Sequence, residues 1–431
     1  MMATVYVGFT LDIVHAGHVT ILNKASSLGD VTLGVITDEA LSNHKSLPIV
    51  DFETRKRIAK GLSGVKTVIN QNEWSYVPTI LKLKPTYFVH GDDWISSDPN
   101  LRDEVLEALD SYGGKLIETK HEENVASASD RYLRSLQMTS GLRLASLRRL
   151  INSNSIVRFI EAHNPMSALI AETLVAQRGE QRVSFHGFWS SSLTDSTSMG
   201  LPDIEVLDFS RRINNINSIF DVTTKPLIYD ADTGGLEEHL AINITTLQRI
   251  GVSALIIEDK TGLKKNSLLG NEVKQSQDTI DGFTRKISKA VEAKIDPNFM
   301  VIARIESLIL EVGMKDAIDR AHAYVDAGAD GIMIHSRKTY PDEIFEFSNK
   351  FRKKFPNIPL ICVPTSYNSV TEKQLSESGF NVVIYANQLL RSAYPAMYNA
   401  AKSILENGRA YEIDQDLMSI KQILNLIPGT K

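Results

Sequence analysis

The stretch Pro226-Leu-Ile-Tyr-Asp230-Ala-Asp232-Thr-Gly-Gly235 carries the pattern that identifies the architecture of most of this chain. A short apolar run ends in two carboxylates, and glycines follow at once. The stretch Ala254-Leu-Ile-Ile-Glu258 repeats the pattern and continues into a polar segment that reaches Ser267. Short apolar runs bounded by turn residues are typical of buried strands. The three carboxylates are therefore expected at strand ends, where together they could hold a divalent cation.

The same pattern recurs through the second part of the chain, where apolar runs alternate with amphipathic helical patterns. This alternation predicts parallel strands that are each followed by a helix. A (β/α)8 barrel collects its active-site residues at the carboxyl ends of its strands. The expected strands are Val183–Phe185, Leu227–Tyr229, Ala254–Ile257, Met300–Ala303, Gly331–Ile334, Leu360–Val363 and Val382–Tyr385, while Ser167–Ile170 fits a strand or a helix. The polar residues at or just after strand ends are Asp230, Glu258, Arg304, His335, Thr365 and Asn387.

The first part of the chain, to about residue 135, predicts a small doubly wound, Rossmann-like α/β sheet. Its expected strands are Ala3–Val7, Val31–Ile36, Thr67–Ile69, Tyr87–His90 and Lys115–Glu118. Between the first strand and the first helix lies Asp12-Ile-Val-His15-Ala-Gly17-His18. Two imidazoles spaced around a glycine can face one phosphate group, while the start of the helix offers backbone donors.

This spacing resembles the HxGH signature of nucleotidyltransferases, and the surrounding segments resemble cytidylyltransferases. The resemblance implies that His15 and His18 stabilise charge on the α-phosphate as pyrophosphate leaves. It also implies a nucleotide, CTP or ATP, and a phosphonate or phosphate acceptor. The residues it assigns to substrate binding are Lys45, Arg55, Asp92, Trp94 and Ser127, of which Ser127 serves equally well as a helix cap.

The second part resembles phosphoenolpyruvate mutase, of the isocitrate lyase superfamily, from Glu161 through Asn387. The resemblance implies a magnesium site in which Asp230 is a direct ligand, while Asp232 and Glu258 act through bound water. It assigns catalysis to Asp203, with Arg304 and His335 as phosphoryl and oxyanion contacts. The matching substrate-binding turn contributes Trp189, Ser191, Ser192 and Leu193.

The reaction that this resemblance implies converts phosphoenolpyruvate to 3-phosphonopyruvate. Lys264, Asn266 and Ser267 would lie on a closing loop that keeps water from the phosphoryl group. Phosphonopyruvate hydrolase is an alternative, and Asn266 favours the mutase. An isocitrate-lyase-type carbon–carbon lyase with a degenerate first domain is a further alternative, but the Lys-Lys-Cys-Gly-His segment of those lyases is replaced here by Lys264-Lys-Asn266-Ser267.

Length and composition set the frame for these assignments. The chain has 431 residues, so two folded domains are expected: residues 1–135, a linker at 136–150, and the barrel at 151–431. A net charge of −5 gives no general attraction to nucleic acid or anionic membranes. One cysteine, Cys362, and the lack of an early apolar run indicate a cytoplasmic protein. The resemblance implies a homo-oligomer, a dimer or tetramer whose barrels exchange a C-terminal helix. The apolar helical pattern after Asp414 fits this exchange or packing within its own chain.

Overall fold

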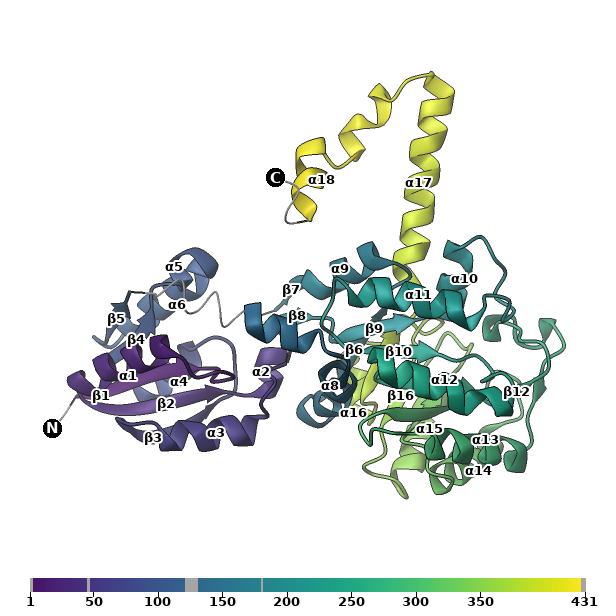
Figure 1. Cartoon of the computed structure of the whole chain (residues 1–431), viewed down its shortest axis with the longest axis horizontal. Coiled ribbons are helices and arrows are strands. Elements are labelled where there is room, and N and C mark those ends of the chain that lie inside the picture. The colour runs from purple at the N-terminus through teal and green to yellow at the C-terminus, as the bar shows by residue number, and fades with distance from the viewer. Residues whose placement is uncertain (1–2, 45–46, 121–130, 180, 428–431) are drawn as a thin grey trace. The chain divides into compact units, whose positions relative to one another are not determined.

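The computed structural model describes residues 3–44, 47–120, 131–179 and 181–427. The chain forms two compact units, residues 1–386 and residues 387–431. The first unit contains an open parallel sheet, followed by a closed barrel (Figure 1). Within the described residues, no helix is both long enough and apolar enough to span a membrane.

The open sheet has the strand order β3-β2-β1-β4-β5, and every strand pair in it is parallel. This arrangement confirms the doubly wound fold predicted for the first part of the chain. The order reverses between β1 and β4, and ligands of such sheets bind at that point, outside the carboxyl ends of the strands. The elements are β1 (Thr4–Phe9), α1 (Ala16–Leu28), β2 (Asp30–Ile36), α2 (Asp38–Ser42), α3 (Phe52–Gly61), β3 (Val65–Gln71), α4 (Val77–Leu83), β4 (Tyr87–Gly91), α5 (Trp94–Ser97), α6 (Pro99–Asp110) and β5 (Lys115–Thr119).

The barrel closes in the order β10-β11-β14-β15-β16-β17-β6-β9, which confirms the second predicted fold. Its elements are α8 (Ser140–Ser153), β6 (Val157–Glu161), α9 (Pro165–Thr173), β9 (Gly187–Ser190), α10 (Ser192–Ser198), α11 (Phe209–Phe220), β10 (Leu227–Asp230), α12 (Glu237–Ile250), β11 (Ala254–Glu258), α13 (Ile280–Glu292), β14 (Met300–Ile305), α14 (Met314–Asp326), β15 (Gly331–Ile334), α15 (Asp342–Arg352), β16 (Leu360–Cys362), α16 (Glu372–Glu377) and β17 (Val382–Tyr385). Outside the barrel lie β7 (Val175–Arg178), β8 (Gln181–Ser184), β12 (Lys260–Thr261), η1 (Ser267–Glu272) and β13 (Ser276–Gln277).

The start of the barrel differs from the sequence prediction. The segment predicted as strand Val183–Phe185 contributes instead to β8, which pairs with β7 as an antiparallel ribbon outside the barrel. The barrel strand is the next one, β9, and it pairs with β6, which the prediction missed. A β-carbon on Gly187 would lie 2.4 Å from the ring of Phe159 and 2.6 Å from the carbonyl oxygen of Pro226, so only glycine lets the strands approach here. Ser167–Ile170 is helical, within α9.

Helix α8 runs through the predicted linker and into the barrel. Its Leu147 and Leu150 are buried and pack with Val157, Ile228 and other residues of the barrel strands. Arg148 on the same helix donates a hydrogen bond of 2.5 Å to Asp330, just before β15. These contacts attach α8 to the barrel, at the amino ends of its strands.

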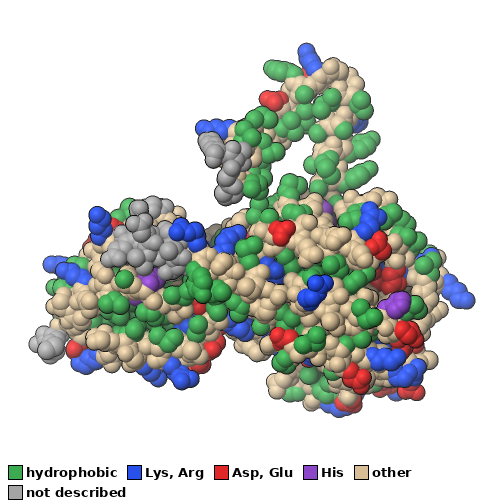
Figure 2. Space-filling view, viewed as in Figure 1, with side chains coloured by type: hydrophobic (Ala, Val, Ile, Leu, Met, Phe, Trp, Pro, Cys, Tyr) green, Lys and Arg blue, Asp and Glu red, His purple; other side chains and the backbone are tan. Residues whose placement is uncertain are grey.

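The second unit consists of α17 (Gln388–Asn407), η2 (Tyr411–Asp416) and α18 (Ile420–Leu426). None of the described residues in these three helices is buried. Several large apolar side chains are exposed along them, and Figure 2 shows hydrophobic side chains over this segment. They include Tyr394, Met397, Tyr398, Leu405, Ile420 and Ile423.

Candidate active sites

The barrel site begins with carboxylates at the ends of two neighbouring strands. Asp230 ends β10 and Glu258 ends β11, and both side chains are buried. The backbone N–H and the hydroxyl of Ser192 donate to Oδ2 of Asp230 at 3.2 and 2.9 Å. Asp232 adopts a left-handed backbone conformation, with φ of 54°, which turns the chain sharply after the strand. The structure therefore brings together Asp230 and Asp232, which the sequence assigned to the magnesium site, and Ser192, which it assigned to the substrate-binding turn.

The loop after β11 places Lys264 among these groups. Its ammonium lies 2.8 Å from Oδ1 of Asp203 and also contacts Asp232 and the hydroxyl of Ser192. Burial opposes the charged form of Lys264, but the carboxylates, Asp232 first, outweigh it and raise the pKa of this ammonium. The amide of Asn266 donates to the other oxygen of Asp203 at 2.7 Å. Both oxygens of Asp203 are thus bound by one loop.

A second cluster forms around Arg304 at the end of β14. Its guanidinium donates to Oε1 of Glu306 and to the hydroxyl of Ser267, both at 2.6 Å, and lies 3.4 Å from Glu258. Burial would raise the pKa of Glu306, but Arg304 and Lys260 reverse the effect and lower it to about 2. Burial dominates at Glu258 and raises its pKa to about 7. Ser267 joins the cluster by donating to Oε2 of Glu306 at 2.5 Å.

His335 follows β15 and is buried beside the Arg304 cluster. Burial, and then the charge of Arg304, lower the pKa of His335 to about 3, so the imidazole is neutral at physiological pH. Its Nδ1 is buried without a hydrogen-bond partner among the described residues. A neutral imidazole with an open nitrogen suits contact with a substrate oxygen better than a charge-pairing role.

The predicted magnesium ligands do not form a ready-made protein cage. Among the described residues, no group of three or more His, Cys, Asp or Glu side chains is arranged to hold a metal ion. Asp232 instead contacts Lys264, and Glu258 lies 3.2 Å from Lys260 while its Oε1 accepts no hydrogen bond from a described residue. Magnesium uses one or two carboxylates, several waters and substrate oxygens. The carboxylate oxygens of Asp230, Asp232 and Glu258 are donors of the kind that magnesium prefers.

Residues of the predicted substrate-binding turn lie partly in the barrel core and partly at the carboxylate site. Trp189 is buried in the core cluster of the barrel, where it packs with Ile228. Ser191 precedes α10 and is buried, while the side chain of Leu193 is only partly buried. Of this turn, Ser192 contacts the site, because its hydroxyl donates to Asp230 and accepts from Lys264.

Sequence reasoning missed Arg212, a buried cation beside the barrel carboxylates. Arg212 of α11 donates to Asp195 at 3.1 Å, to the carbonyl of Asp230 at 2.6 Å and to the carbonyl of Ser190 at 3.0 Å. It also lies 3.5 Å from Asp232. A signal was present, because Arg212 shares the apolar face of α11 with residues such as Ile216. Lys260 and Glu306 were missed as well.

The second site lies at the carboxyl end of β1. His15 caps α1, and its Nδ1 accepts from the N–H of Gly17 at 3.2 Å, while Nδ1 of His18 accepts from the N–H of His15 at 3.3 Å. The two rings lie 4.0 Å apart. Burial, and then His15, lower the pKa of His18 to about 4. Because Nδ1 of His18 accepts a hydrogen bond, the neutral tautomer of this ring carries its proton on Nε2.

Both histidines line a pocket that other predicted residues reach only partly. His90, Gly91 and Asp93 line it, whereas Trp94 is 2 % exposed and stacks on His90 at 4.0 Å. Asp92 lies between these residues, in the turn after β4. Lys45 and Ser127 lie outside the described residues.

The structure places Arg55 differently from the prediction. It is fully buried, and its guanidinium donates to Asp38 and to the carbonyls of Thr10, Ile36 and Val50. It does not line the pocket. Its donors are directed at the protein, so Arg55 shapes the site rather than contacting a substrate.

The fold and the two sites define an α/β protein in which a Rossmann-like sheet precedes a (β/α)8 barrel with an ionic site at its strand ends. Residues 147–405, more than half of the chain, match the family model described as phosphoenolpyruvate phosphomutase, and the chain belongs to this family. Residues 6–130 match a second family model, described as cytidylyltransferase-like. The two matches confirm both resemblances.

The relatives include enzymes with different named activities. Phosphonopyruvate hydrolase of Variovorax sp. (strain Pal2) is 35% identical over 283 residues, covering 65% of this chain and 93% of the relative. Phosphoenolpyruvate phosphomutase of Tetrahymena pyriformis is 30% identical, over 67% of this chain and 92% of the relative. The crystal structure of phosphoenolpyruvate phosphomutase from Streptomyces platensis subsp. rosaceus has a TM-score of 0.59 at 32% identity, covering 65% of this chain and 93% of that structure.

Proposed function

We propose that the barrel interconverts phosphoenolpyruvate and 3-phosphonopyruvate. The observation that supports this best is the grip on Asp203, whose two oxygens are contacted by Lys264 and Asn266 from one loop. The side chain of Asp203 is 7% exposed and that of Lys264 is 5% exposed. A loop that buries a reacting carboxylate also excludes water, and a phosphoryl group in transit must be protected from water.

The residues of the site divide the work of this isomerisation. The bond from phosphorus to the enol oxygen breaks, a bond from phosphorus to C3 forms, and no proton is gained or lost overall. Arg304 and Lys264 supply positive charge for the enolate and the phosphoryl group. Asp203 acts as phosphoryl acceptor or as electrostatic partner. Magnesium, held by Asp230 with Asp232 and Glu258 acting through water, would supply further positive charge to substrate oxygens.

A second candidate function is the hydrolysis of phosphonopyruvate. The identity of 35% to the Variovorax hydrolase favours it. In that reaction, water takes the phosphoryl group and pyruvate leaves. Asn266 supports the mutase, because the hydrolases tend to carry a different residue at this position. Here its amide donates to Oδ2 of Asp203 at 2.7 Å. Lys264-Lys-Asn266-Ser267 also lacks the cysteine of the carbon–carbon lyases, which makes lyase activity the least supported of the three.

Phosphorus NMR of the full chain with magnesium and phosphonopyruvate separates these functions. We expect conversion to phosphoenolpyruvate by the wild type and none by Asp203→Ala. Asp208→Asn is a matched control, since it removes a nearby carboxylate but keeps a good cap for α11. Release of inorganic phosphate and pyruvate would identify a hydrolase instead, and an unchanged substrate signal would reject both functions.

For the first domain, we propose nucleotidyl transfer from CTP to a phosphonate, with release of pyrophosphate and with ATP as the alternative nucleotide. His15 and His18 support it, because two imidazoles that line one pocket at a helix start suit the charge that develops on the α-phosphate. The barrel reaction would make phosphonopyruvate, and later conversion of this product could provide the phosphonate acceptor. A cytoplasmic location belongs to this proposal, because both nucleotides and phosphoenolpyruvate are cytoplasmic metabolites.

Pyrophosphate release tests this second activity. We expect turnover with CTP and 2-aminoethylphosphonate that is lost in His15→Ala and His18→Ala, while His239→Asn on the surface of the barrel retains it. Faster turnover of glycerol 3-phosphate or choline phosphate would reject a phosphonate acceptor. Faster turnover of ATP would reject CTP.

A further inference from the structure

The segment Leu47–Val50, here called loop 47–50, forms part of the wall of the pocket that contains both histidines. Pro48 of this loop lines the pocket, together with Asp12, His15 and His18. The carboxylate of Asp12 accepts hydrogen bonds of 2.9 Å from the N–H groups of Ile49 and Val50. The loop is therefore tied directly to the segment that carries the histidine motif.

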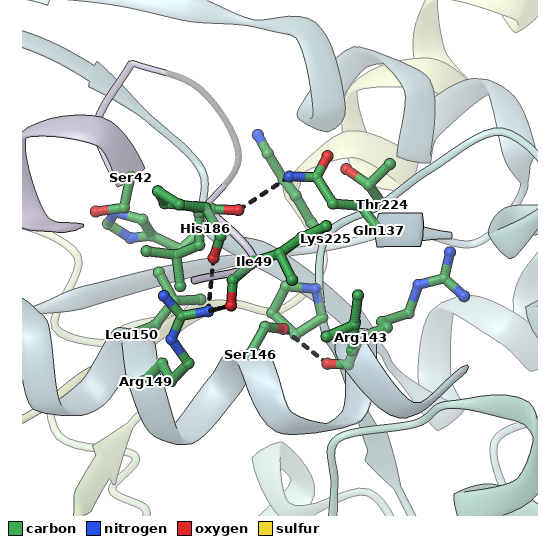
Figure 3. A pocket seen from close by; sticks show the side chains of 14 residues that line it. Ser42, Ile49, Gln137, Arg143, Ser146, Arg149, Leu150, His186, Thr224 and Lys225 are labelled. Carbon is green, nitrogen blue, oxygen red and sulfur yellow. Dashed lines mark hydrogen bonds between the residues drawn. The ribbon is translucent and has the colours of Figure 1, made fainter. Parts of the chain in front are cut away.

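The other side of loop 47–50 is held by a residue of the barrel. Nη1 of Arg149 donates to the carbonyl of Pro48 at 2.6 Å and to that of Ile49 at 3.1 Å. Figure 3 shows Arg149 reaching Ile49 from α8. Since α8 packs into the barrel core through Leu147 and Leu150, this contact links the barrel to the wall of the other site.

Asp38 extends the link to the chain just before the histidine motif. Its Oδ2 accepts from Arg149 at 3.0 Å, and its Oδ1 accepts from Arg55 at 2.6 Å. Arg55 in turn donates to the carbonyls of Thr10 and Val50 at 2.5 and 3.1 Å. One charged network therefore fixes Thr10, which precedes the histidine motif, and loop 47–50. Charge-assisted bonds of this kind are stronger and more directional than neutral ones.

The barrel also supplies part of the pocket wall itself. Glu172 at the end of α9 and Thr224 just before β10 line the pocket. Thr224 precedes the amino end of its strand, whereas Asp230 marks the carboxyl end. The carboxylate site of the barrel and the histidine pocket consequently lie toward opposite ends of the same strands.

We propose that Arg149 is a positioning residue through which the barrel sets the geometry of the nucleotidyltransferase site. This inference rests on the nucleotidyl transfer proposed above. Displacement of a catalytic group by about 1 Å can cost about 10²-fold in rate, so loss of the anchor of loop 47–50 affects turnover although Arg149 itself need not touch the substrate. The reaction in the barrel, at the other strand ends, provides an internal control.

The test compares Arg149→Ala and Arg149→Lys with two control variants of the full chain. Asn43→Ala removes another hydrogen bond between the same two domains, the one that Arg158 donates at 2.9 Å. Arg148→Ala removes the contacts of α8 with Pro297, Asn298 and Asp330 inside the barrel. Nucleotidyl transfer is followed by pyrophosphate release, and phosphonopyruvate conversion is measured on the same samples.

For Arg149→Ala, we expect kcat of nucleotidyl transfer to fall by about 10²-fold, with a smaller change in KM for the nucleotide and unchanged phosphonopyruvate conversion. Arg149→Lys should recover part of kcat, because one ammonium can reach some of the acceptors but cannot reproduce the planar fork. Both control variants should stay within about twofold of wild type.

If the wild type catalyses nucleotidyl transfer, three results would overturn the inference. They are an unchanged kcat in Arg149→Ala, an equal fall of kcat in Asn43→Ala, and loss of both activities in Arg149→Ala. The last would show that Arg149 maintains the fold as a whole. A wild type without nucleotidyl transfer, from CTP or ATP, would instead reject the proposed function of the domain.

Discussion

The ammonium nitrogen of Lys264 lies 2.8 Å from Oδ1 of Asp203, although the two residues come from different loops of the barrel. The same ammonium contacts Asp232, so a single positive charge joins the loop after β9 and α10 to the carboxylates after β10. Removing it would leave buried carboxylates facing each other without this cation. Lys264 therefore contributes both to closure of the loop and to the charge balance of the site.

Lys264→Ala is expected to reduce kcat for phosphonopyruvate conversion by about 10²–10³-fold, because a cation placed for developing negative charge is lost. Phosphorus NMR time courses at saturating substrate measure this. The control is the neighbouring variant Lys265→Ala, which removes one positive charge from the same loop without changing its length. Its kcat should stay close to that of the wild type. Equal losses in the two variants would show that loop charge in general, and not the contact with Asp203, is responsible.

Arg212→Met is expected to destabilise the barrel by about 3–5 kcal/mol, because Asp195 would remain buried without its cation. Urea unfolding followed by circular dichroism measures the loss. Arg211 is the exposed neighbour on α11, and Arg211→Met should change stability by no more than about 0.5 kcal/mol.

The double variant Arg212→Met with Asp195→Asn tests the cause of this loss. Replacing the carboxylate by an amide removes the uncompensated charge, so part of the stability should return. A double variant as unstable as Arg212→Met alone would indicate that the hydrogen bonds to the carbonyls of Asp230 and Ser190, rather than the ion pair, carry the effect.

The sequence predicted the parts of this molecule that depend on local pattern. Apolar runs that end in charge located β10, β11 and β14, because these strands are buried on both sides and their ends carry the site. The prediction was wrong at Val183–Phe185, because an apolar run cannot show whether it pairs inside the barrel or in the ribbon of β7 and β8. Pairing depends on distant residues such as Phe159, against which Gly187 packs.

The candidate sites show the same division. Residues at strand ends and in the histidine motif could be named because a short motif carries them. Arg149 could not, since it lies on a helix and acts on backbone carbonyls that are remote in sequence. For Arg212 the signal was its place on the apolar face of α11, which does not show the carbonyls that it reaches. Arg55 was named from its basic segment, but only the fold shows that its charge is directed inward, toward Asp38.

The stability of the barrel should depend on the titration of His335. Burial, then Arg304, lower its pKa to about 3, against about 6.5 in the unfolded chain. Between these values the unfolded state binds the proton and the folded state does not, so stability falls as the pH falls. This one group should cost about 1.4 kcal/mol between pH 7.5 and 5.5.

The comparison of wild type with His335→Asn isolates this contribution, because other titrating groups are common to both proteins. Urea unfolding at the two pH values should show a loss in the wild type that is larger, by about that amount, than the loss in the variant. Parallel losses would mean that His335 is protonated in the folded protein at pH 5.5, contrary to its burial beside Arg304.

The exposed apolar side chains of α17 predict self-association of the chain. Tyr394 is 66% exposed, Met397 62% and Tyr398 57%, and their spacing places them along one stripe of the helix. A contiguous apolar stripe of this kind is typical of an interaction surface.

Light scattering after size-exclusion chromatography should give a mass at least twice the 47.9 kDa of the single chain. Tyr394→Asp combined with Met397→Asp should reduce that mass, because charge would be buried in the interface, whereas Lys402→Glu on the same helix should not. A wild type that elutes as a single chain would contradict self-association through this helix.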